Sequence, residues 1–179
     1  RRKNFLINYK FLNNYKNVIF LGLKDEFLDL KKDIPNLEFY DFGPWFAPNQ
    51  KFSFSPKTIL PCFFSYPITT NSHGMRSAPV DLMRNDNKKL RLAILGDSVS
   101  EGLQVSDEYL FSNLMNINLK KNKIRNEILN FGFSGYGTAQ QLFLYEKKVK
   151  YFNPDIVLLF VTASNDLRNN SMYLDYQAY

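Results

Sequence analysis

The stretch Arg91–Gly102, R-L-A-I-L-G-D-S-V-S-E-G, determines the fold that we expect for this chain. Its apolar residues 92–95 are followed abruptly by Gly96-Asp97-Ser98. An apolar run that is bounded by a turn signal predicts a buried strand. A serine on the sharp turn after such a strand exposes its hydroxyl at the edge of the sheet, as nucleophile elbows do. A turn without any chemical role is the alternative, and this stretch alone does not decide between the two.

Two later runs, Asn126–Phe131 and Asp155–Val161, predict further strands. The second is continuously apolar, which is typical of a strand covered on both faces. With helical spacing between the runs, residues 92–161 follow a β-α-β-α-β pattern, which predicts an α/β fold with a parallel sheet. Such sheets bind ligands beyond the carboxyl ends of their strands. Three turns should therefore converge on one crevice: those at Ser98, at residues 132–137 and at Asn165.

The two intervening segments predict helices with one apolar face each. The first should begin at Ser106 or Asp107 and run to about Leu119. The second should begin at Thr138, because Gln141 three residues later gives the spacing of a capping box. The residues expected on the two apolar faces are Leu110, Leu114 and Ile117 in the first helix, and Leu142, Tyr145, Val149 and Phe152 in the second.

The composition is that of a globular protein and argues against several classes of function. Hydrophobic residues make up 45% of the 179 residues, and the net charge of +6 is spread over lysines that alternate with acids. Without a basic stripe, we expect no nucleic-acid partner. The single Cys62 and single His73 exclude an intrachain disulfide and argue against a metal site, and we expect no cofactor. No apolar run approaches the roughly 18–20 residues that span a bilayer.

Residues 1–70 are expected to form an accessory or extended segment that precedes the main domain at 71–179. The motif Gly43-Pro44 predicts a loop. The aromatic residues Phe42, Trp45 and Phe46 could line a ligand site, but such clusters more often belong to a core. The chain opens on basic residues without an initiator Met, so an upstream membrane anchor or signal segment is an expectation. Three elements are expected: strands at Val18–Leu21 and Leu37–Phe42, and a helix at Lys24–Lys32.

A serine hydroxyl, a glycine-rich turn and an asparagine amide around one crevice suit acyl transfer. Ser98 would attack an ester carbonyl, and the oxyanion that forms needs hydrogen-bond donors. The backbone N–H groups of Ser98 and Gly135 and the side-chain amide of Asn165 could supply them. A neutral serine also needs a base within hydrogen-bond reach.

These residues resemble the SGNH, or GDSL, hydrolases, whose fold is a flavodoxin-like three-layer parallel sheet. Gly96-Asp97-Ser98 resembles their first block and Asn130–Gly135 their second, and Ala163–Asp166 is similar to their third, with alanine in place of a glycine. Asn71–Arg76 also resembles a segment that precedes the nucleophile strand in bacterial members. The resemblance implies Ser98 as the nucleophile, with Gly135 and Asn165 as oxyanion donors.

The fourth block of the family, Asp-x-x-His, supplies the base, and no histidine follows Asn165 in this chain. We expect this block beyond Tyr179, with the fold incomplete at the C-terminus. The alternatives are a protein that has lost its base, and His73 as a substitute base.

The resemblance implies a serine esterase that acts on a small-molecule or polysaccharide acyl ester, with an extracytoplasmic location. An O-acyltransferase that uses the same serine remains open, as does a non-catalytic glycan-binding or structural subunit. The sequence leaves the oligomeric state undetermined.

Overall fold

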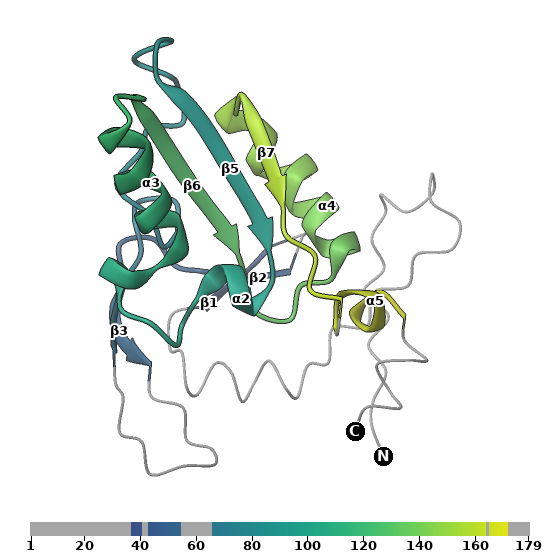
Figure 1. Cartoon of the computed structure of the whole chain (residues 1–179). Coiled ribbons are helices and arrows are strands. Elements are labelled where there is room, and N and C mark those ends of the chain that lie inside the picture. The colour runs from purple at the N-terminus through teal and green to yellow at the C-terminus, as the bar shows by residue number, and fades with distance from the viewer. Residues whose placement is uncertain (1–36, 41–42, 55–65, 164, 172–179) are drawn as a thin grey trace, which may run out of the picture.

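The centre of the molecule is a parallel sheet of three strands in the order β6-β5-β7 (Figure 1). The computed structural model describes residues 37–40, 43–54, 66–163 and 165–171. Strand β5 spans Leu90–Gly96, β6 spans Asn126–Gly132 and β7 spans Ile156–Leu159. Ile94 in the middle strand lies opposite Asn130 on one side and Leu158 on the other. The predicted α/β class with a parallel sheet is confirmed, and all three strands end at the same edge.

Helices cover the two faces of this sheet. The alternation of β5 side chains assigns each helix to a face, because successive residues point to opposite sides. Leu92 and Ile94 pack with residues of α3 (Phe111–Lys121), whereas Ala93 and Leu95 share a cluster with residues of α4 (Thr138–Lys147) and of the 3₁₀ helix η3 (Val149–Phe152). Three short helices complete the described chain: α2 (Ser98–Glu101), η2 (Asp107–Tyr109) and α5 (Asp166–Asn169).

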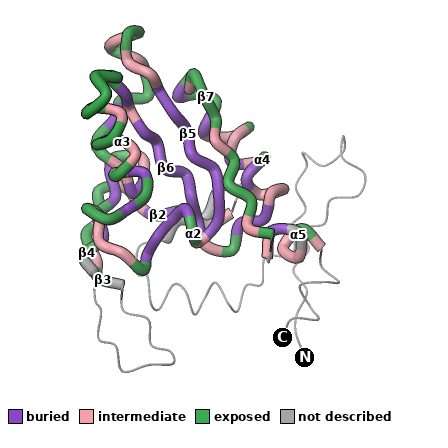
Figure 2. The backbone as a smooth tube through the Cα atoms, in the orientation of Figure 1, coloured by how far each residue is buried: buried purple, intermediate pink, exposed green. Residues whose placement is uncertain are grey.

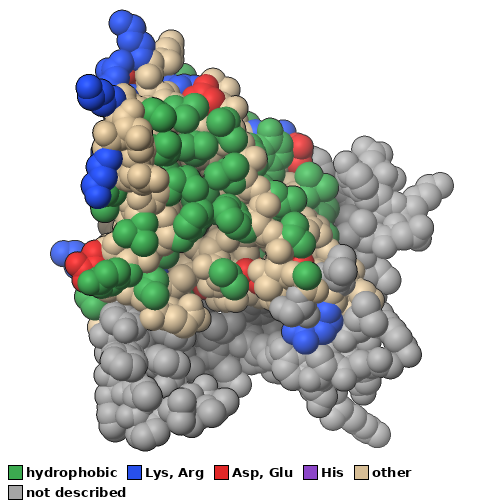
Figure 3. Space-filling view, viewed as in Figure 1, with side chains coloured by type: hydrophobic (Ala, Val, Ile, Leu, Met, Phe, Trp, Pro, Cys, Tyr) green, Lys and Arg blue, Asp and Glu red, His purple; other side chains and the backbone are tan. Residues whose placement is uncertain are grey.

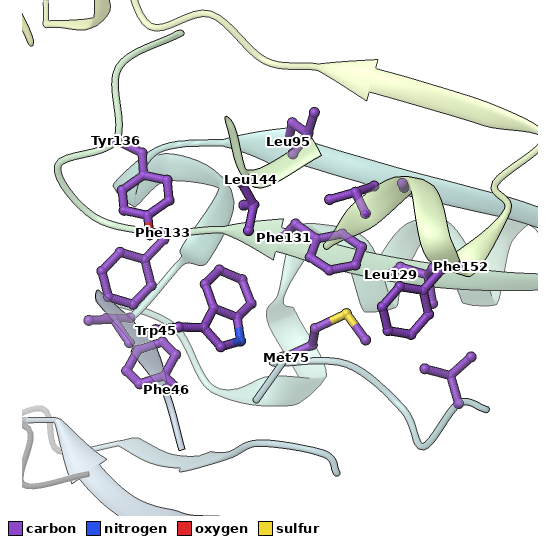
Figure 4. Close-up of a cluster of buried hydrophobic side chains, with 14 of the residues drawn as sticks. Trp45, Phe46, Met75, Leu95, Leu129, Phe131, Phe133, Tyr136, Leu144 and Phe152 are labelled. Atoms are coloured by element: carbon purple, nitrogen blue, oxygen red, sulfur yellow. The ribbon is translucent and has the colours of Figure 1, made fainter. Parts of the chain in front are cut away.

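The larger core cluster joins the sheet to residues that come before it in the chain. Two antiparallel pairs precede the sheet: β1 (Leu37–Tyr40) with β2 (Gly43–Phe46), and β3 (Lys51–Phe54) with β4 (Tyr66–Thr69). Trp45 and Phe46 are almost fully buried and contact Phe133 at centroid distances of 5.6 and 5.2 Å (Figure 4). The interpretation of Trp45 and Phe46 as core is confirmed. The predicted loop at Gly43-Pro44 is wrong, because these residues begin β2.

The first predicted helix begins later than expected and is rotated about its axis. Residues 107–109 form η2, and Leu110 is the N-cap of α3. Leu110 is buried, but Leu114 and Ile117 are 48% and 46% exposed. Met115 and Leu119 pack on the sheet instead. Because each helical residue turns the side-chain direction by about 100°, the break at residue 110 was sufficient to move the apolar stripe away from the sheet.

The second predicted helix begins at Thr138 as expected, but its N-cap and capping pair are each one residue earlier. Gly137 is the N-cap, and its N–H donates to Gln140 Oε1, so the capping contact does not involve Thr138 and Gln141. Leu142 is 55% exposed, while Val149 and Phe152 are buried as expected. The regular α-helix ends at Lys147, and η3 continues the segment.

Strand β7 forms as predicted, but it is not covered on both faces. Its only strand neighbour among the described residues is β5, and Ile156, Val157 and Leu159 are exposed. Figure 2 shows this difference between β7 and the buried strands β5 and β6. Hydrophobic side chains gather on the same side of the molecule, over α3 and the sheet (Figure 3). The prediction of a doubly covered strand is therefore wrong for the described part of the chain.

Other expectations fall wholly or partly outside the described residues. The predicted elements at Val18–Leu21 and Lys24–Lys32 lie there, and the strand expected at 37–42 is seen for Leu37–Tyr40. In the part of the chain that is described, none of the helices has the length and apolar character needed to cross a membrane.

Candidate active site

Ser98 begins a single helical turn at the carboxyl end of β5. Asp97 is the N-cap of this turn, and its Oδ1 accepts a hydrogen bond of 3.0 Å from the N–H of Val99. Gly102 ends the turn with a φ of 66°, and its N–H donates to Ser98 O at 2.9 Å. An aspartate at the N-cap and a left-handed glycine after the last helical residue are strong signals for the two ends of a helix. Ser98 is half-buried and forms no side-chain hydrogen bond with the described residues.

The turn can pack onto the sheet because two glycines lie beneath it. A Cβ at Gly132 would lie 2.5 Å from Glu101 N and 2.6 Å from Ser100 C, which are backbone atoms. A Cβ at Gly96 would overlap the Ser100 hydroxyl. Glycine at the ends of β5 and β6 thus lets the helical turn approach the strands closely, and this fixes the position of Ser98.

Asn165 reaches the same turn from the far end of the described chain. Its Nδ2 donates to Asp97 Oδ2 at 2.9 Å, although the two residues are 68 positions apart. The neighbouring Asp166 is buried and anchors the loop, because its Oδ2 accepts a hydrogen bond of 2.9 Å from Thr162 N. Burial raises the pKa of the Asp166 carboxyl above its usual range, and the nearby Asp97 adds to this effect. The second hydrogen on Asn165 Nδ2 is left for another acceptor, since a primary amide carries two donors.

Gly135 lies on a loop that is tied to both neighbouring segments. The backbone N–H of Ser134 donates to Glu101 Oε2 at 3.1 Å, and Asn169 Nδ2 donates to Gly135 O at 3.3 Å. Gly135 is exposed and has a φ of +80°, which favours glycine, yet a Cβ there would meet nothing within 4 Å. Packing within the protein therefore does not require glycine at this position, and the space beside its peptide is open.

The structure thus connects the segments of the three predicted site residues. Ser98 and Asn165 meet through Asp97, and the loop of Gly135 is linked to the Ser98 turn through Glu101. A second contact joins the first turn of α4 to the end of α5, because Ala139 N donates to Asn170 Oδ1 at 2.9 Å. A hydroxyl, a carboxamide and an exposed peptide accordingly lie on segments that follow the carboxyl ends of the strands and that hydrogen bonds join.

Two residues of this region were not assigned by the sequence analysis. Glu101 is 1% exposed, and burial raises the pKa of its carboxyl to about 8, despite the hydrogen bonds from Ser134. Arg76 is equally buried and donates to the carbonyl oxygens of Glu101, Gly102 and Val105, and to Asp107 Oδ1 at 2.8 Å. Arg76 lies in the segment that resembles the lead-in to the nucleophile strand, which was the only sequence signal for it. Nothing in the spacing of the sequence indicated that Glu101 is buried.

His73 is held by contacts with residues other than Ser98. Its ring packs edge-on against Phe152 at 4.9 Å, and its Nε2 is 3.1 Å from Val80 O. The carbonyl of Phe152 accepts a hydrogen bond of 2.7 Å from Arg91, at the start of β5. The Phe152 ring also contacts Phe131 at a centroid distance of 5.5 Å, so these contacts hold the His73 ring against core residues. The interpretation of His73 as a structural residue agrees with these contacts.

Two further features of the described residues bear on ligands. A pocket of about 260 Å³ is lined largely by basic side chains, and it lies where β6 begins, away from Ser98. Among the described residues, no group of three or more histidine, cysteine, aspartate or glutamate side chains could hold a metal ion. Neither feature adds a ligand to the Ser98 site.

Comparisons with known proteins identify no family for this chain. No family model matches it, and no curated protein matches its sequence. One solved structure that is similar in part is that of a Bacteroides fragilis protein to which acylhydrolase activity is ascribed, with 18% sequence identity and a TM-score of 0.33. The match covers 55% of this chain and 47% of that chain, so the present chain corresponds to about half of that protein. A likeness of this extent carries no argument about activity.

Proposed function

We propose that this chain carries the nucleophile and oxyanion-binding part of a serine ester hydrolase of the SGNH type. The observation that supports this most directly is the 2.9 Å hydrogen bond from Asn165 Nδ2 to Asp97 Oδ2. It brings the amide of one loop to the residue before Ser98, at the edge of the sheet where α/β proteins bind ligands. The three blocks that resemble the family are then neighbours in space as well as in order.

The chemistry follows from what each group can donate or accept. Ser98 Oγ forms a bond to the carbonyl carbon of the ester, the carbonyl π electrons move to its oxygen, and the serine proton passes to a base. The N–H groups of Ser98 and Gly135 and the free amide hydrogen of Asn165 stabilise the resulting oxyanion. Collapse of the intermediate breaks the bond to the alcohol, which leaves with a proton, and water then releases the acyl group. Removal of one oxyanion donor costs about 10²–10³ in kcat in other serine hydrolases.

The base in this proposal is the histidine of the family's Asp-x-x-His block. The only histidine in this sequence, His73, packs against Phe152 and lies beside the Val80 carbonyl rather than Ser98, so we do not assign the base to it. For the substrate we propose a small-molecule or polysaccharide acyl ester. Transfer of the acyl group to a sugar hydroxyl would use the same atoms, with an alcohol in place of water in the second step.

A fluorophosphonate probe tests the proposal on the full-length protein. We expect labelling at Ser98, identified by peptide mass spectrometry, and its complete loss in Ser98→Ala. Asn165→Ala should slow labelling about 10²–10³-fold, because the phosphonyl oxygen occupies the same donor site as the oxyanion. Ser72→Ala, at an exposed serine outside the site, should label at the wild-type rate.

The outcome also separates the competing functions. Release of acetate into water from a model ester, without transfer to an added sugar, would support a hydrolase over an acyltransferase. If the folded full-length protein is not labelled at Ser98, or if Ser98→Ala is labelled as well as the wild type, the proposal is wrong and a non-catalytic binding role is favoured.

A further inference from the structure

Glu101 occupies a position from which it can connect the nucleophile turn to the oxyanion loop. It is the last residue of α2, three residues after Ser98, and its side chain is 1% exposed. Because Gly102 closes this short helix and Arg76 donates to the carbonyl oxygens of Glu101 and Gly102, the backbone of Glu101 is fixed relative to Ser98. The Glu101 side chain therefore starts from a backbone position that is fixed relative to Ser98.

The carboxyl of Glu101 contacts the residue immediately before Gly135. Its Oε2 accepts two hydrogen bonds from Ser134, one from the backbone N–H at 3.1 Å and one from the hydroxyl. These bonds join segments that are 33 residues apart in the sequence. Gly135 has open space beside it and a φ of +80°, so its own packing restrains it little. The contact at Ser134 therefore restrains the residue whose carbonyl group shares a peptide with the Gly135 N–H, while Asn169 Nδ2 restrains the carbonyl oxygen of Gly135.

The cost of burying this carboxyl argues that it is not present for stability. Its Oε1 has no hydrogen-bond partner among the described residues, and leaving a buried polar atom unpaired is unfavourable. Burial raises the pKa of Glu101 to about 8, because desolvation and the nearby Asp97 outweigh the hydrogen bonds from Ser134 and the attraction of Arg76. An apolar side chain of the same length would avoid this cost. Departures of this kind from stable packing are expected at functional sites.

We propose that Glu101 is a positioning residue, whose buried carboxyl holds Ser134 by its N–H and hydroxyl, so that the peptide that follows Ser134 presents the Gly135 N–H to the oxyanion formed at Ser98. This inference rests on the proposed function. Glu101 does not touch the substrate in this account; it acts through Ser134. A carbonyl oxygen is all that the role requires, so a neutral carboxyl or a carboxamide can perform it.

Two substitutions at position 101 separate positioning from simple packing. Glu101→Met keeps the length of the side chain but removes the acceptor, and we expect kcat for a model ester to fall about tenfold to a hundredfold with KM within about twofold. Glu101→Gln keeps the acceptor oxygen and should retain kcat within about threefold of the wild type. If position 101 were needed only for packing, Glu101→Met, which keeps the length of the side chain, would retain kcat as well as Glu101→Gln does. Glu108→Gln makes the same change at an exposed carboxylate seven residues after Glu101. It is the matched control and should behave as wild type.

A double-mutant cycle tests the route through Ser134. Ser134→Ala removes the hydroxyl but leaves the backbone N–H, so we expect a smaller loss of kcat than in Glu101→Met. Combined with Glu101→Met, it should add nothing, since both changes interrupt the same contact. Additive losses would contradict the proposed route. Wild-type rates of ester hydrolysis and Ser98 labelling in a folded Glu101→Met protein would overturn the inference.

A measurement without activity keeps this inference distinct from the proposed function. Backbone ¹⁵N relaxation should give order parameters at Ser134 and Gly135 near about 0.85 in wild type and in Glu101→Gln, and below about 0.6 in Glu101→Met. If wild type is not labelled at Ser98 but these order parameters fall as expected, the hydrolase proposal fails while the positioning role is supported. If the order parameters do not change, the positioning role is wrong.

Discussion

At the scale of single residues, the candidate site is surrounded by acidic groups that the protein keeps away from water. Asp97, Glu101 and Asp166 are all almost fully buried, and the pKa values of Glu101 and Asp166 are raised by burial. Asp97 accepts hydrogen bonds from Val99 and Asn165, and Asp166 accepts one from Thr162. These carboxyls orient backbone and amide donors. One of these donors, the side-chain amide of Asn165, is also a proposed oxyanion donor.

Glu101 makes a testable contribution to the pH dependence of stability. Its pKa is about 8 in the folded protein against an ordinary value of 4.5, so between these pH values the folded state binds the proton more strongly than the unfolded state. Its contribution therefore decreases as pH rises from about 4.5 to about 8, by up to about 1.4 kcal/mol per pH unit. Glu101→Gln removes this term. We expect the stability of the variant relative to wild type to increase with pH across this window, as measured by urea unfolding at several pH values. A difference that is independent of pH would contradict the raised pKa.

The residues that could be predicted from the sequence are those that directly follow a strand. Ser98, Gly135 and Asn165 could each be singled out because an apolar run ends a few residues before it, and parallel strands end at one edge. Glu101 could not be identified in this way. A glutamate after a polar turn usually faces solvent, and its burial depends on Ser134, a residue 33 positions away. A contact between residues so far apart in the chain cannot be predicted from the spacing of neighbouring residues in the sequence.

At the scale of elements, the strands were more predictable than the helix faces. An apolar run indicates a strand regardless of how that strand pairs with its neighbours, so β5, β6 and β7 could be predicted. The facing side of a helix depends on where the helix begins, and the interruption by η2 turned Leu114 and Ile117 outward. The exposure of β7 also escaped prediction, because the same apolar run serves an edge strand and a central strand equally well.

The close approach of α2 to β6 gives a prediction for Gly132. Gly132→Ala would place a Cβ 2.5 Å from Glu101 N, so the helical turn must move. We expect a loss of about 1–3 kcal/mol in the free energy of unfolding, together with slower labelling of Ser98, because the turn carries the nucleophile. Chemical unfolding and fluorophosphonate labelling measure the two effects.

Gly135→Ala is a useful comparison for stability. Its Cβ would meet nothing within 4 Å, and only the φ of +80° is unfavourable, at about 1 kcal/mol. Equal stability of Gly132→Ala and wild type would contradict the packing described here.

At the scale of the whole molecule, the segment before residue 71 and the sheet share one core. Trp45, Phe46 and Ile68 belong to the same cluster of buried residues as Phe131 and Phe133. This shared core could not be predicted from local sequence patterns, because β1 to β4 are only four residues long each and their partners are set by tertiary contacts. The motifs that begin at Asn71 predict a boundary near residue 70 instead. Whether that boundary is also a boundary of folding can be tested directly.

The single tryptophan of the chain provides this test, since Trp45 is 1% exposed and contacts Phe131 and Phe133. If the segment and the sheet unfold together, the change in Trp45 fluorescence and the loss of far-ultraviolet circular dichroism should coincide in guanidinium chloride. Phe133→Ala should lower the midpoint of both transitions together, by about 3–5 kcal/mol in the free energy of unfolding. Leu142→Ala, at a side chain that is 55% exposed, should change either signal little. A fluorescence transition at lower denaturant than the circular dichroism transition would show instead that the segment before residue 71 unfolds as a separate unit. The Ser98 site would then be supported by the sheet and its helices without it.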